Sequence, residues 1–217
     1  MSVGRDRVLG DIRAALKRRG PLPTSVTSAL EGRLKNSTPN LLPRIEGELI
    51  VAFARKVEAV HGILSRVSSM DEVSSVVLRH VEKYALPFEI VVAPDPALDG
   101  IPWSNRFTLA RRAASGDDCL SVTSAFAGIA ETGTLVLLSG PESPTTLNFL
   151  PEDHVVVVSR ERIVLHMEDV WARIREERKR IPRTVNFITG PSKTADVELT
   201  IQEGAHGPRR LLVILVG

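Results

Sequence analysis

One carboxylate of this sequence lies between two glycines, directly before a buried strand. Glu131 is part of the run GIAETGT, residues 128–134, and the apolar residues 135–138 follow at once. Glycine adopts backbone angles that are closed to other residues, so the run predicts a turn. A carboxylate held at the edge of a buried strand is costly to desolvate unless another group partners it. The pattern therefore indicates a functional site; the alternative is a plain turn whose Glu131 points into water.

Two further polar turns adjoin predicted strands. Residues 190–196, GPSKTAD, follow a strand predicted at 185–189, and residues 204–208, GAHGP, precede one predicted at 211–216. Ligands of open α/β sheets bind beyond the carboxyl ends of the strands, which is where the first of these turns is expected. Its backbone N–H groups, two hydroxyls and one ammonium suit a phosphate or a carboxylate. Histidine titrates near neutral pH, so His206 in the second turn could act as an acid or base, or could simply be exposed.

The three turns supply a set of candidate site residues. The predicted catalytic residues are Glu131, His206 and Asp196, because each could accept or donate a proton. Lys193 and Asp196 would be solvated by default, and their assignment rests on their place in a turn that follows a strand. The predicted substrate- or anion-binding residues are Thr132, Gly133, Thr134, Gly190, Ser192, Lys193, Thr194 and Gly207.

Several common kinds of site do not fit the sequence. No GxGxxG run follows a strand, and in residues 128–134, which carry two glycines at the Walker A spacing, Thr134 stands where the lysine would be. The five histidines show no metal-ligand spacing on a credible helix, so no metal site is predicted. The single cysteine, Cys119, excludes an internal disulfide and a cluster held by four thiolates of this chain. A formal net charge of +2 gives no global basic field for nucleic acid.

Helical and strand patterns alternate along most of the chain. Helices of about 14 residues between short, continuous apolar strands predict βαβ units and a mainly parallel sheet in a three-layer α/β/α fold. The run of four valines at 155–158 predicts a central strand that is buried on both faces. Helices are predicted at 48–61, 69–84 and 168–181, and strands at 63–67, 88–93, 119–123, 135–138, 155–158, 185–189 and 211–216.

The first 47 residues differ from the rest. A helix is predicted at 3–18, followed by an irregular connection to about residue 47 that contains four prolines. The predicted organisation is thus an extension at 1–47 and an α/β domain at 48–217. No apolar run approaches the roughly 18 residues of a membrane span, and residues 1–19 lack the apolar core of a signal peptide. A cytoplasmic location is expected.

The three polar turns resemble those of the LUD-domain family. The resemblance rests on AETGTL at 130–135, NFITGPSKTADVE at 186–198 and HGP at 206–208, and it covers roughly residues 48–217. It implies a fold like that of the NagB/RpiA/CoA-transferase group. It also implies a role in oxidising L-lactate to pyruvate together with two iron–sulfur partner proteins. Those partners would carry the clusters, so no cofactor is expected in this chain. The resemblance supplies no established catalytic residue.

Three hypotheses follow for the function. The leading one is a subunit of an L-lactate-oxidising system, in which Lys193 and the Gly190 turn hold a carboxylate and Glu131 or His206 handles a proton. A second is a stand-alone enzyme of the same fold that acts on a CoA ester or a sugar phosphate. A third is a non-catalytic subunit that organises the iron–sulfur proteins. The sequence does not rank the first and third, because it shows no site for an electron acceptor.

Overall fold

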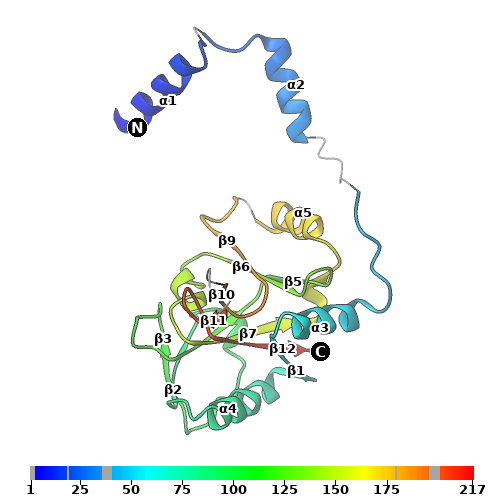
Figure 1. Cartoon of the computed structure of the whole chain (residues 1–217), viewed down its shortest axis with the longest axis vertical. Helices are drawn as coiled ribbons and strands as arrows, with labels where there is room; N and C mark the ends of the chain where they lie inside the picture. Colours follow the sequence, from blue (N-terminus) through cyan, green and yellow to red (C-terminus); the bar gives the residue numbers. More distant parts are fainter. Residues whose placement is uncertain (1–2, 19, 36–40, 179, 196–200) are drawn as a thin grey trace. The chain divides into compact units, whose positions relative to one another are not determined.

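The chain forms two compact units, residues 1–42 and 43–217. The computed structural model describes residues 3–18, 20–35, 41–178, 180–195 and 201–217 (Figure 1). The first unit contains helices α1 (Val3–Ala15) and α2 (Thr24–Lys35), so the irregular connection predicted for residues 20–47 is wrong in its first half. Pro23 directly precedes α2, at a position where proline does not disturb a helix. No helix of the described residues is long and apolar enough to cross a membrane.

A six-stranded parallel sheet forms the centre of the second unit. Its order is β1-β12-β7-β4-β2-β3, and all five pairings are parallel. The predicted α/β class with a parallel sheet between helices is therefore confirmed. The strands are β1 (Ile63–Val67), β2 (Glu89–Val92), β3 (Thr108–Arg111), β4 (Leu120–Ser124), β7 (Asp153–Ser159) and β12 (Arg210–Val216).

Two helices cover opposite faces of this main sheet. Val155 and Val157 of β7 pack with α4 (Val73–Lys83) on one face. Val156 and Val158 pack with α3 (Leu49–Ala59) on the other. The valine run is thus a strand buried on both faces, as the sequence predicted. A short 3-10 helix, Met70–Glu72, precedes α4.

A second sheet, which the sequence did not predict, packs against the face of the main sheet that α3 also covers. Its order is β8-β5-β6-β9, with antiparallel β5–β6 and β6–β9 pairs. Leu135 and Leu137 of β6 pack in the cluster that contains α3, whereas Val136 packs with α5 (Met167–Glu177). Helix α5 therefore covers the outer face, on the opposite side of the molecule from α4 (Figure 1). The strands are β5 (Ala127–Ile129), β6 (Thr134–Leu138), β8 (Ile163–Val164) and β9 (Val185–Ile188); a separate antiparallel pair is β10 (Lys193–Ala195) and β11 (Ile201–Glu203).

Two glycine turns lie directly against α3. Gly133, in the turn between β5 and β6, has a φ of +71°, and a Cβ there would lie 2.6 Å from the backbone carbon of Lys56. Gly190, after β9, has a φ of +78°, and a Cβ there would overlap the Val60 carbonyl oxygen. Each position needs glycine for its backbone angle and again for the close approach to the helix. The close contact with helix α3 thus fixes the positions of both polar turns.

We expect Gly133→Ala to lower the free energy of unfolding by roughly 3 kcal/mol, because the methyl group adds a backbone clash to a positive φ. Urea unfolding at neutral pH measures the change. Gly116→Ala is the control, since a Cβ at that position meets open space. Equal stabilities of the two variants would contradict the close approach of this turn to α3.

Candidate functional site

Glu131 lies at the tip of the β5–β6 hairpin, and a buried histidine partners it. The Glu131 N–H donates to the Leu165 carbonyl at 3.1 Å, which ties the turn to the segment before α5. Glu131 Oε2 lies 3.0 Å from His166 Nδ1, with side-chain exposures of 29% for the glutamate and 8% for the histidine. The His166 N–H in turn donates to Asp169 Oδ2 at the start of α5. The carboxylate therefore has the partner that its burial requires.

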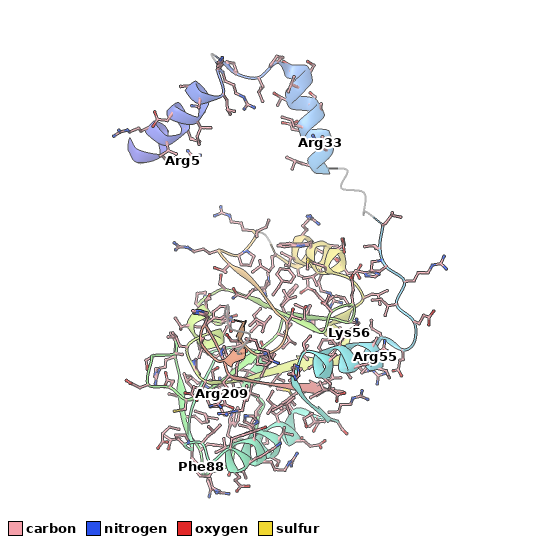
Figure 2. The ribbon with its side chains drawn as sticks, viewed as in Figure 1. Arg5, Arg33, Arg55, Lys56, Phe88 and Arg209 are labelled. Carbon is pink, nitrogen blue, oxygen red and sulfur yellow. The ribbon has the colours of Figure 1, made fainter. Side chains whose placement is uncertain are left out.

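Glu131 also lines a hollow rich in positive charge. This hollow, called here the Glu131 hollow, has a volume of about 490 Å³ and lies between the outer side of α3 and residues 43–46. Arg55 and Lys56 project from α3 (Figure 2), and Arg44 contributes a third cation. Two carboxylates, Glu46 and Glu131, oppose these three cations, so the hollow keeps an excess positive charge. A small carboxylate fits this charge balance.

A chain of hydroxyl groups links the Glu131 turn to the Gly190 turn. Thr132 Oγ1 lies 2.6 Å from Thr134 Oγ1, which lies 2.6 Å from Thr189 Oγ1. Thr134 is buried, with 3% of its surface exposed. The contact brings residues 55 positions apart into one hydrogen-bonded row. The two turns are thus neighbours along α3.

A second hollow joins the other two polar turns. It has a volume of about 230 Å³, and Gly190, Ser192, His206 and Gly207 all line it; we call it the His206 hollow. The Ser192 N–H donates to the Pro208 carbonyl at 2.8 Å, which holds the turns together. Asn148 lines the same hollow, and its Oδ1 is buried without a hydrogen-bond partner in the structure. An unpaired buried amide oxygen is costly and is a natural place for a ligand donor.

The predicted location of the Gly190 turn is wrong. The turn does follow a strand, but that strand, β9, belongs to the second sheet and pairs antiparallel with β6. The hydrogen bond from Ser192 to Pro208 places the turn beside the segment that leads into β12, at the amino end of that strand. The rule for the carboxyl ends of parallel strands therefore does not apply to it.

Comparison with known proteins identifies the family of this chain. The model of the LUD domain family matches residues 50–216. The chain belongs to the LUD-domain family. A DUF162 family protein from Deinococcus radiodurans shares the fold, with a TM-score of 0.57 and 22% identity over 81% of this chain and all of that one.

Curated relatives match a shorter part of this LUD protein. A protein of Geobacillus sp. (strain WCH70) is 40% identical over 91 residues, 41% of this chain and 38% of that protein. A protein of Anoxybacillus flavithermus is 40% identical over 88 residues, 41% of this chain and 39% of that protein. Both are named lactate utilization protein C. The alignments span about two-fifths of the length of these relatives.

The LUD domain divides the predicted site residues between the two hollows. Glu131 and Thr132 line the first, and Gly190, Ser192, His206 and Gly207 line the second. Thr134 belongs to the hydroxyl row and Gly133 to the contact with α3. Lys193 is exposed, Lys193 and Thr194 are residues of β10, and Asp196 lies outside the described residues. The catalytic and binding roles remain predictions.

Sequence reasoning missed the hydrogen-bond partner of Glu131 and the cations that line the same hollow. His166 follows Glu131 by 35 positions, and it shows no metal spacing or glycine-rich context that would single it out. Arg55 and Lys56 read as the solvated face of an amphipathic helix. Only the tertiary fold brings them together. Within the described residues, no three of His, Cys, Asp or Glu are grouped to hold a metal ion.

We expect a double-mutant cycle of Glu131→Gln and His166→Ala to show a coupling free energy of about 1 kcal/mol in stability, since the two side chains share a partly buried hydrogen bond. Urea unfolding of the four proteins at pH 7 measures it. The matched cycle uses His206→Ala in place of His166→Ala, because His206 is exposed, and it should be additive. Additivity in both cycles would contradict the Glu131–His166 contact.

Proposed function

We propose that this LUD protein is a component of an L-lactate utilisation system that oxidises L-lactate to pyruvate together with iron–sulfur partner subunits. The names of the relatives support lactate utilisation, although each alignment covers about two-fifths of both proteins. The single observation that carries the assignment of the site is the Glu131–His166 pair at the edge of a cationic hollow. This combination supplies a proton acceptor beside a binding site for a carboxylate.

The hollow would hold L-lactate by its carboxylate. Arg55 and Lys56 adjoin Glu131 in the lining, so the lactate carboxylate would bind these cations and its C2 hydroxyl would face Glu131. Arg55 can donate two parallel hydrogen bonds to a carboxylate, and Lys56 adds a point charge. Charge-assisted hydrogen bonds of this kind fix orientation as well as affinity.

Glu131 would take the hydroxyl proton. His166 acts as a positioning residue, because its Nδ1–H donates to Oε2 and leaves the other carboxylate oxygen for the substrate. As the C2–O bond becomes a carbonyl, the C2–H bond breaks. Lactate thus loses two electrons and two protons, one to Glu131 and one to solvent. The iron–sulfur clusters of the partner subunits would supply the electron acceptor.

The first unit offers surfaces on which partner subunits could bind. Val8 and Ile12 of α1 are exposed and lie four positions apart on one face. Val26, Leu30 and Leu34 of α2 repeat that spacing and are also exposed. Apolar faces of this kind on short helices are typical of segments that pack against another protein. They support a role within a complex.

We expect Glu131→Gln to lower dye reduction by L-lactate about 100-fold or more in the assembled complex, because a general base is lost. The assay compares complexes purified from the native host with each variant of this chain. Glu58→Gln is the matched control, since Glu58 is an exposed carboxylate of the same helix as Arg55 and Lys56.

Two results would contradict this assignment. Full activity of the Glu131→Gln complex would move the chemistry to the partners and leave this chain an organising subunit. A loss of activity only in His206→Ala would move the substrate to the His206 hollow, where the Gly190 turn would hold the carboxylate.

A further inference from the structure

A second region of the molecule has the features of a ligand site, and no candidate residue from the sequence lies in it. Two adjoining hollows, of about 390 and 380 Å³, share Asp95, Ser124, Phe126 and Arg178. Asp95 follows β2, and Ser124 is the last residue of β4. The region, called here the sheet-end cleft, therefore lies at the carboxyl ends of parallel strands, where ligands of open α/β sheets bind.

Two arginines of the sheet-end cleft have no carboxylate partner among the described residues. Arg178 and Arg180 line the larger hollow, and neither forms an ion pair within the part of the chain that the structure describes. The Arg178 guanidinium lies 5.7 Å from the centre of the Phe126 ring, which holds it by a cation–π contact. Arg162 approaches the same ring but is neutralised by Glu177 at 2.7 Å. Two guanidinium groups without carboxylate partners favour a doubly charged anion.

Two serine hydroxyls line the same hollow as these arginines. Ser139 Oγ accepts a hydrogen bond from the Thr184 N–H at 2.8 Å, so its own hydrogen is available to a ligand oxygen. Ser143 lines the same hollow and adds a second hydroxyl. Guanidinium groups together with serine hydroxyls are the usual protein ligands of a phosphate.

A fixed carboxylate forms another wall of the sheet-end cleft. Asp95 Oδ1 accepts from the Ala97 N–H at 2.9 Å, and Oδ2 accepts from the Ser124 hydroxyl. Both contacts hold the carboxylate rigidly while leaving lone pairs for a further donor. Glu142 also lines the larger hollow. A ligand that was only an anion would be repelled by these two acids, whereas hydroxyl groups on the ligand would bind them.

We propose that the sheet-end cleft binds a small organic phosphate that carries free hydroxyl groups. Its phosphate would bind Arg178 and Arg180, and a hydroxyl would donate to Asp95. The volume of about 390 Å³ exceeds the needs of a three-carbon acid and lies in the range of ligand pockets. No residue lines both this cleft and the Glu131 hollow, so the inference is independent of the proposed lactate function.

Isothermal titration of the full chain with AMP and with glycerol 3-phosphate tests the proposal. Both probes join a phosphate to free hydroxyls, and the comparison shows whether a nucleobase contributes. We expect saturable binding of at least one probe, weakened about tenfold or more by Arg178→Ala combined with Arg180→Ala. Arg175→Ala is the matched control, an exposed arginine of α5 that does not line the cleft. Glycerol, which lacks the phosphate, should show no saturable binding.

Asp95→Asn distinguishes recognition of hydroxyls from simple charge attraction. The substitution should weaken the binding of both organic phosphates and leave the binding of inorganic phosphate unchanged or tighter. Glu131→Gln should not alter the binding of either probe, so a failure of the lactate assignment would not affect this result. Absence of saturable binding by both probes, or binding that survives loss of both arginines in a folded variant, would overturn the proposal.

Discussion

The close packing of two glycine turns on helix α3 is the constraint on which the candidate site depends. Gly133 approaches the Lys56–Val57 backbone, and Gly190 approaches Val60, one helical turn further along. Because no side chain separates turn from helix, Glu131 is brought beside the cations of α3. The same packing brings Thr134 to Thr189 and so joins the two turns. Loss of either glycine contact with α3 would separate Thr134 from Thr189, which lie 55 positions apart in the chain.

Asp153, a buried carboxylate away from the candidate site, is held by two hydrogen-bond donors. Burial raises the pKa of a carboxyl, but hydrogen bonds from His80 and Arg210 outweigh it and hold the pKa of Asp153 below its ordinary value. The hydrogen bonds of this cluster connect α4 to the amino ends of β7 and β12, so its charges have a structural role. His154, beside it, is neutral, because burial lowers its pKa to about 3. The Glu131–His166 pair differs, since its carboxylate is part of the lining of a hollow.

Five strands of the main sheet could be predicted because they carry their own signal, whereas the edge strand β3, whose residues are mostly exposed, was not predicted. Valine and leucine runs that are buried on both faces read as parallel strands between helices, whatever their partners. The second sheet could not be predicted in this way. Its strand β5 has three residues with a central glycine, and Gly128 is there because a Cβ would meet Phe53 and Ile163. From the sequence, such a glycine predicts a turn; in the structure, it allows two elements to pack closely.

The candidate site was predicted by residue type but not by arrangement. Glycine-flanked polar turns are local features, so Glu131, Ser192 and His206 could be singled out from the sequence. Their distribution between two hollows follows from strand pairing in the second sheet, which short strands do not encode locally. The partners of Glu131 and the arginines of the sheet-end cleft lie on helical surfaces or at a helix end. In sequence they are indistinguishable from solvated charges.

Titration of the isotopically labelled chain with L-lactate, followed by the amide resonances of the protein, tests the central claim most directly. The Glu131 hollow predicts saturable shifts at Glu131, Thr132 and Lys56, with Ser192 and Gly207 unchanged. These shifts should disappear when Arg55→Ala is combined with Lys56→Ala, because these two cations bind the lactate carboxylate. Shifts confined to Ser192 and Gly207, or no saturable shift at any residue, would contradict a lactate site at the Glu131–His166 pair.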